Sequence, residues 1–171
     1  MRPLEQTHIV QVLAPVEING AARTTDYVSL KNYQHCTFLL CFGLETAGGD
    51  CDIAVRASDD VSGTHTADLA TIKSRKSGAV GTSDAWAAEA TVTDSKLDYV
   101  AAGDIIPDTD ENKMVAIEVD AAAVKAASTT YGMDCVALYI PDPGQSTFLC
   151  VLAILSGPRY AGPNMATAIT D

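Results

Sequence analysis

The stretch Phe148-Leu149-Cys150-Val151-Leu152-Ala153-Ile154-Leu155 is the longest apolar run of the chain and decides its fold class. Its eight residues match a β-strand in length and fall short of the roughly 18 that a membrane-spanning helix needs. Because neighbouring side chains of a strand point to opposite faces, both faces of this strand would be apolar. Such a strand is central in the fold or covered by another subunit, and residues 36–42 have the same character.

Shorter apolar segments, separated by clusters of Gly, Pro, Asp and Ser, fill the rest of the chain. This spacing is typical of an antiparallel β-sandwich or barrel. Ile53 and Val55 share one face of their segment, as do Val115 and Ile117, which predicts one face on a core and one on solvent. We expect strands at residues 9–13, 27–30, 36–42, 51–57, 69–75, 86–92, 97–100, 114–119, 135–140 and 148–155.

The connections add one helix and one hairpin to this prediction. Residues 120–128 are rich in alanine and begin with Asp120, a good N-cap residue, which predicts a helix of at most two turns. The turn-forming loop 141–144 lies between the expected strands 135–140 and 148–155 and predicts that these two strands pair as an antiparallel hairpin.

The length of 171 residues predicts one domain, which we place at residues 8–156. Residues 1–7 and 157–171 are poor in strand formers. They are either frayed ends or extended arms that reach onto neighbouring subunits. The start of the chain has no apolar core of a signal peptide, so we expect none.

The charge balance excludes several partners. The 11 basic and 22 acidic residues give a formal net charge of −11. That field repels phosphate, which argues against nucleic acid and against anionic membranes as partners. It fits a soluble protein, or one that meets a basic partner surface. Lys73, Arg75 and Lys76 form the one positive patch, with Lys73 and Arg75 on the same face of an exposed strand.

No catalytic, cofactor or metal site is expected. The sequence has no GxSxG, GxxxxGK[ST] or GxGxxG motif, and its three histidines, His8, His35 and His65, stand at wide spacing. We therefore expect a protein that is not an enzyme. The acidic stretch 104–112 is the best calcium candidate, but the EF-hand pattern is incomplete, and a solvated acidic loop is favoured.

The cysteines are expected to be free thiols. Their number is odd, no CxxC pair occurs, and no signal peptide is expected, which indicates a reducing compartment. An odd separation places Cys36 and Cys41 on opposite faces of one strand, so these two cannot bridge each other without a β-bulge. Pairs across strands stay open. The five residues are Cys36, Cys41, Cys51, Cys135 and Cys150.

Several stretches, in order along the chain, resemble strands of small virion proteins of tailed bacteriophages and prophages. They are Asp26-Tyr-Val-Ser-Leu-Lys-Asn-Tyr33, His35-Cys-Thr-Phe-Leu-Leu40, Ala57-Ser-Asp-Asp-Val-Ser-Gly63, Ala116-Ile-Glu-Val-Asp120, Asp134-Cys-Val-Ala-Leu-Tyr139 and Val151-Leu-Ala-Ile-Leu-Ser-Gly-Pro-Arg-Tyr160. The chain thereby resembles capsid decoration, or cement, proteins. This resemblance implies a β-sandwich of jelly-roll type that sits on the outer shell and clamps the major capsid protein.

The function expected from this resemblance is structural. The protein would be made in the host bacterial cytoplasm, join the outer capsid surface of the virion as a homo-trimer or dimer, and stabilise the shell without a cofactor. Alternatives are a head–tail joining, tail or fibre-base protein and, in another class, a carbohydrate- or calcium-binding β-sandwich module. The expected interface residues lie in the arms and the long apolar strand: Arg2, Leu4, Phe148, Leu149, Val151, Leu152, Arg159 and Tyr160.

Overall fold

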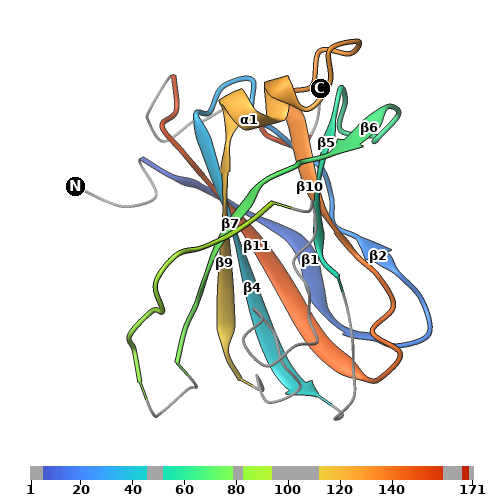
Figure 1. Cartoon of the computed structure of the whole chain (residues 1–171), viewed down its shortest axis with the longest axis vertical. Coiled ribbons are helices and arrows are strands. Elements are labelled where there is room, and N and C mark those ends of the chain that lie inside the picture. The colour runs from blue at the N-terminus through green and yellow to red at the C-terminus, as the bar shows by residue number, and fades with distance from the viewer. Residues whose placement is uncertain (1–5, 46–51, 79–82, 94–111, 160–166, 170–171) are drawn as a thin grey trace.

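The computed structural model of the chain describes residues 6–45, 52–78, 83–93, 112–159 and 167–169. The regular elements of these residues are strands, with one short helix (Figure 1). The elements are β1 (His8–Ile18), β2 (Arg23–Thr24), β3 (Val28–Ser29), β4 (His35–Glu45), β5 (Ala54–Ser58), β6 (Thr66–Asp68), β7 (Ile72–Lys76), β8 (Ala90–Val92), β9 (Met114–Asp120), α1 (Ala121–Ala126), β10 (Cys135–Ile140) and β11 (Thr147–Ser156).

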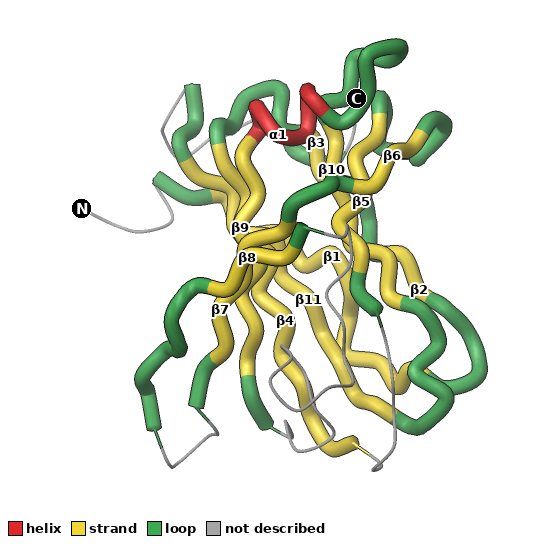
Figure 2. The backbone as a smooth tube through the Cα atoms, viewed as in Figure 1, coloured by secondary structure: helices red, strands yellow, loops and turns green. Residues whose placement is uncertain are grey.

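The strands form two sheets. The large sheet has the order β1-β11-β4-β9-β7-β8, and the small sheet has the order β2-β10-β5-β6, with β3 also paired to β10. Every strand pair is antiparallel. The long strands of the large sheet run side by side, while β10, β5 and β6 form a separate layer (Figure 2). The prediction of an all-β, antiparallel β-sandwich is confirmed.

The core lies between the two sheets and follows the predicted alternation. Val115 and Ile117 of β9 are fully buried, as expected from their shared face. From the small sheet, Val55 of β5 and Leu138 of β10 belong to the same buried cluster as Phe38 of β4. Burying such aliphatic and aromatic side chains contributes about 1.5–3 kcal/mol each, so this cluster supplies the main drive for folding.

The predicted hairpin of residues 135–140 and 148–155 is wrong. β10 pairs with β2, β3 and β5 in the small sheet, whereas β11 pairs with β1 and β4 in the large one. The loop between β10 and β11 crosses from the small sheet to the large sheet. Packed sheets lie about 10 Å apart, a distance that a loop of this length can span. Asp142 holds the crossing, because its Oδ1 accepts hydrogen bonds from the backbone N–H groups of Gly144 and Gly20, each at 3.0 Å.

The other predicted elements have mixed outcomes. The helix is confirmed as α1, but Asp120 makes no side-chain capping bond. The short strands β2 and β6 were not predicted from the sequence. The expected strand at 97–100 and the acidic stretch 104–111 lie outside the described residues.

Part of the C-terminal segment packs on the domain itself. Ala168 is 1% exposed and belongs to the core cluster. Its carbonyl accepts a hydrogen bond of 2.7 Å from the N–H of Ser29 in β3. Upstream, the N–H of Arg159 donates to the carbonyl of Asn32 at 3.0 Å. At these points the C-terminal segment is therefore held by this chain rather than extended as an arm.

The turn before β6 requires a glycine at position 63. Gly63 has φ +72°, and a Cβ there would lie 2.7 Å from Cε2 of Tyr27, which is itself 9% exposed. We expect Gly63→Ala to lower the free energy of unfolding by about 2 kcal/mol, through backbone strain and this clash together. Urea denaturation of the two proteins measures the difference.

The matched control is Gly20→Ala. Gly20 has φ +75°, but nothing lies within 4 Å of a Cβ at that position. This variant carries the backbone strain without the clash, so it should lose less stability than Gly63→Ala. Equal losses would show that Tyr27 does not constrain the turn.

Candidate protein-binding face

The long strand β11 presents two different faces. Leu149, Val151, Ala153 and Leu155 point into the core and are at most 2% exposed. The residues between them point the other way and are partly exposed or exposed. The two-sided apolar strand predicted from the sequence therefore has one side in the core of this chain and one on its surface.

Neighbouring strands continue this outward side in register. Residues paired across antiparallel strands share a face, so the outward side can be followed row by row. One row runs Ile9, Ile154, Thr37, Glu118; the next runs Gln11, Leu152, Leu39, Ala116; a third runs Cys150, Cys41, Met114. Most of these positions are apolar. We call this surface the outer face and define it by Ile9, Leu39, Cys41, Met114, Phe148, Cys150, Leu152 and Ile154.

The outer face is an exposed apolar patch on the large sheet. Ile9 is 45% exposed and Phe148 is 46% exposed, and the other members are partly exposed. Soluble monomers rarely expose contiguous apolar patches, and those that they do expose commonly mark protein-binding surfaces. This arrangement suits the burial of another protein surface more than it suits chemistry.

A histidine between two carboxylates borders the outer face. The Nδ1 of His35 lies 2.9 Å from Oδ1 of Asp120, and its Nε2 contacts Oε2 of Glu118. The hydroxyl of Thr37 also donates to Oε2 of Glu118, at 3.0 Å. Burial lowers the pKa of His35, but the hydrogen bonds and the charges of Glu118 and Asp120 outweigh it and raise the pKa above its usual value.

This cluster predicts a pH dependence of stability. Because the folded-state pKa of His35 is above the unfolded value of 6.5, protonated His35 favours the folded state. Its contribution is complete below pH about 6.5 and is lost as the pH rises through the folded-state pKa. We expect it to be at most about 1 kcal/mol, because His35 and Glu118 are partly exposed and Asp120 is mostly exposed.

Urea denaturation between pH 5 and 9 measures this contribution. In the His35→Gln variant the decrease over this range should be smaller than in the unmodified chain. Parallel pH profiles for the two proteins would contradict the assignment to His35.

Two basic residues of β7 continue the rows of the outer face, because Lys73 pairs with Glu118 and Arg75 pairs with Ala116. Lys73 and Arg75 are both exposed on β7, which confirms that they share a face. Their side chains converge on Glu89, with Nζ of Lys73 3.8 Å from Oε1 and Nη2 of Arg75 3.7 Å from Oε2. Lys76 is partly buried, and that burial, with the charge of Lys113, lowers its pKa to about 8. The patch is thus partly neutralised and offers little for a polyanion.

The predicted interface residues separate into three groups. Phe148 and Leu152 lie on the outer face, whereas Leu149 and Val151 lie in the core and cannot contact a partner without unfolding. Arg159 is exposed after the end of β11. Arg2, Leu4 and Tyr160 lie outside the described residues. Ile9, Leu39 and Met114 also lie on the outer face and were not predicted from the sequence.

The outward side of the small sheet is different in character. Cys135 and Ala137 of β10 are buried with Tyr27, and Val61 packs against them. Further along, the guanidinium of Arg56 lies 4.2 Å from the ring centroid of Tyr139. The Nε of Arg56 also donates to Oδ1 of Asp68 at 2.9 Å. This side is covered or polar, so the apolar patch belongs to the large sheet.

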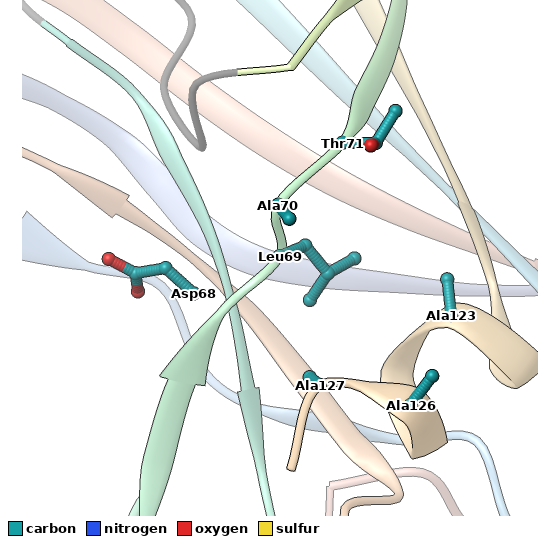
Figure 3. A pocket seen from close by; sticks show the side chains of 7 residues that line it. All are labelled: Asp68, Leu69, Ala70, Thr71, Ala123, Ala126 and Ala127. Carbon is teal, nitrogen blue, oxygen red and sulfur yellow. The ribbon is translucent and has the colours of Figure 1, made fainter.

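A shallow pocket lies between α1 and the chain that passes from β6 to β7. Leu69, Ala70 and Thr71 face the alanines Ala123, Ala126 and Ala127 across it (Figure 3). Its volume is about 280 Å³, and its single carboxylate, Asp68, is paired with Arg56. Asp68 is the only titratable group among the residues that line the pocket, and Thr71 supplies its only hydroxyl.

The remaining histidines have structural partners. Nδ1 of His8 lies 2.8 Å from the hydroxyl of Tyr33. Nδ1 of His65 lies 2.7 Å from Oδ2 of Asp59, and its ring stacks on Tyr131 with 3.9 Å between centroids. Among the described residues, no three His, Cys, Asp or Glu side chains are placed to hold a metal ion. No helix in this part of the chain is long and apolar enough to cross a membrane.

Comparisons with known proteins give distant likenesses. No protein-family model matches the chain, and no curated protein matches it. It is similar to the crystal structure of the SPBc2 prophage-derived protein YomS, with a TM-score of 0.43 and 10% identity over 88% of this chain and 93% of that one.

A second similar structure is that of infectious bursal disease virus, Gt strain. Its TM-score is 0.27, with 9% identity over 92% of this chain and 38% of that one. Both TM-scores and identities are too low to assign a family or a function. The chain is thus similar to a prophage-derived protein, without belonging to a family established by these matches.

Proposed function

We propose that this chain is a non-catalytic structural protein of a tailed-phage virion, which binds the major capsid protein through its outer face and stabilises the shell. The observation that carries the proposal is the contiguous apolar surface of the large sheet around Leu39 and Leu152. The choice of the major capsid protein as the partner rests on the sequence resemblance to decoration proteins. A protein that binds only the assembled shell stabilises that shell by mass action.

The charge of the chain supports the same kind of partner. A net charge of −11 favours a basic surface opposite it, and Glu118 and Asp120 place two carboxylates at the border of the outer face. Apolar contact would supply the affinity, while the charges would guide the approach and the orientation. The proposed assembly includes a homo-dimer or trimer of this chain on the outer capsid surface.

The strand order supports the jelly-roll form of sandwich. β1, β11, β4 and β9 are consecutive in one sheet, and β2, β10, β5 and β6 are consecutive in the other. Each sheet therefore mixes strands from the beginning, middle and end of the chain, and β7 and β8 extend the large sheet. Jelly rolls occur in viral capsid and lectin domains, a likeness that concerns fold alone.

The contacts of the described residues support a non-enzymatic role. The Cys36 thiol is fully buried, and burial raises its pKa, so it is poorly suited to act as a nucleophile. None of the residues in the three His–acid contacts lines the pocket beside α1. We infer binding rather than catalysis.

Mixing the purified chain with undecorated shells tests the proposal. We expect the chain to co-sediment with the shells at high copy number and to raise the temperature at which they open. Co-sedimentation at only a few copies per particle would favour a head–tail joining or tail protein. Failure to co-sediment, with shell stability unchanged, would refute the capsid proposal.

A further inference from the structure

Two cysteines face each other at the centre of the outer face. Cys41 of β4 and Cys150 of β11 are direct partners in the antiparallel register. Both side chains are partly exposed, and a hydrogen bond joins their thiols. By contrast, Cys36 and Cys135 are fully buried. Among the described cysteines, the strand register brings this pair directly opposite each other.

We propose that Cys41 and Cys150 form a reversible dithiol–disulfide pair that a small disulfide oxidant, such as glutathione disulfide, closes into a cross-strand bridge. The geometry permits the bond. Directly opposed residues of an antiparallel pair have Cα atoms about 4.5–5.5 Å apart, and disulfides span Cα distances of about 4.4–6.8 Å. Closure therefore needs side-chain rotation and little movement of the backbone.

The exchange balances in two steps. One thiolate of the pair attacks glutathione disulfide, which breaks its S–S bond, forms a mixed disulfide and releases one glutathione. The second thiolate then attacks the protein sulfur of the mixed disulfide, which forms the Cys41–Cys150 bond and releases the second glutathione. Two electrons pass to the oxidant, and the two thiol protons end on the two glutathione molecules.

The environment of the pair sets the rate of this exchange. Burial and the neighbouring Cys150 raise the pKa of Cys41 to about 11. Little of Cys41 is therefore thiolate at neutral pH, so closure that begins with attack by Cys41 should be slow at pH 7 and faster by up to about tenfold per pH unit above it. A reducing cytoplasm would keep the pair open, and an oxidising exterior would close it.

Incubation of the reduced full chain with glutathione disulfide tests the proposal. After remaining thiols are blocked, intact mass should show the loss of two hydrogen atoms, and peptide mapping should show a Cys41–Cys150 linked peptide. The bridge should raise Tm by several degrees, because it restricts the unfolded chain, and a reductant should reverse the rise. Stable glutathione adducts on the unmodified chain, or a linkage to Cys51, would overturn the proposal.

Matched variants separate the two thiols from the others. Cys41→Ser and Cys150→Ser should each retain a glutathione adduct on the remaining cysteine of the pair, because no partner is left to displace it. The Cys36→Ala variant should form the Cys41–Cys150 bridge as readily as the unmodified chain. A bridge that survives in Cys41→Ser would also refute the assignment.

This inference is tested on the free chain and does not rest on the proposed function. If the outer face does bind shells, bound protein should be protected from alkylation at Cys41 and Cys150. If shell-bound protein is alkylated at these cysteines as fast as free protein, while the free chain still forms the bridge, the outer face is not the docking surface. The proposal of the disulfide would be unaffected by that result.

Discussion

The Phe38→Ala variant is expected to unfold with a free energy about 3–5 kcal/mol lower than that of the unmodified chain. Phe38 is 0% exposed at the middle of β4, and its register partners Ala153 and Ile117 are also fully buried. Truncation would leave a cavity that these rigidly paired strands cannot close. Because small domains have only about 5–15 kcal/mol of stability in total, urea denaturation should show a large shift of the midpoint.

Phe148→Ala provides the matched control. The same chemical change is made in the same sheet, but Phe148 is 46% exposed and points to the outer face. Its loss should cost no more than about 1 kcal/mol of folding stability, since much of the ring is already in water. Similar losses in the two variants would contradict the division of the large sheet into a core side and a surface side.

The Leu152→Asp variant is expected to bind shells at least 100-fold more weakly while remaining folded. Leu152 lies between Gln11 and Leu39 in the row that crosses the middle of the outer face. A partner seated there would bury the new carboxylate without a counter-charge, at a cost of several kcal/mol. Each 1.4 kcal/mol of binding free energy changes the affinity about tenfold. A 100-fold loss of affinity therefore corresponds to about 2.8 kcal/mol, which is within the expected cost of burying the carboxylate.

A charge of the same sign elsewhere tests whether position matters. Thr66→Asp adds one carboxylate on an exposed residue of β6, in the small sheet. We expect shell binding of this variant to match that of the unmodified chain in quantitative co-sedimentation. Equal weakening by Thr66→Asp would attribute the effect to net charge, and unchanged binding by Leu152→Asp would exclude the outer face as the docking surface.

The candidate site shows how far sequence reasoning reaches. Side chains alternate between the two faces of a strand, so residues two apart lie on the same face. This rule predicted from the sequence that Lys73 shares a face with Arg75, and that Ile53 shares a face with Val55. The contact of His35 with Glu118 and Asp120 could not be predicted in this way. It depends on the pairing of β4 with β9, and those strands lie far apart in the chain.

The sequence by itself determined the class of fold. The apolar runs and their alternation are local properties, so they predicted most of the long strands, the helix after Asp120 and the excess of apolar surface on residues 148–155. They also predicted a strand that is apolar on both faces, and the structure places one of these faces in the core and the other on the surface.

The tertiary structure alone decided which strands meet. β10 and β11 follow each other in the chain, yet they lie in different sheets, where each pairs with strands remote in sequence. That choice of register placed Leu149 in the core and Leu152 on the surface, and it brought Cys41 opposite Cys150. Neighbour relations between strands are long-range, so no local pattern of residues encodes them.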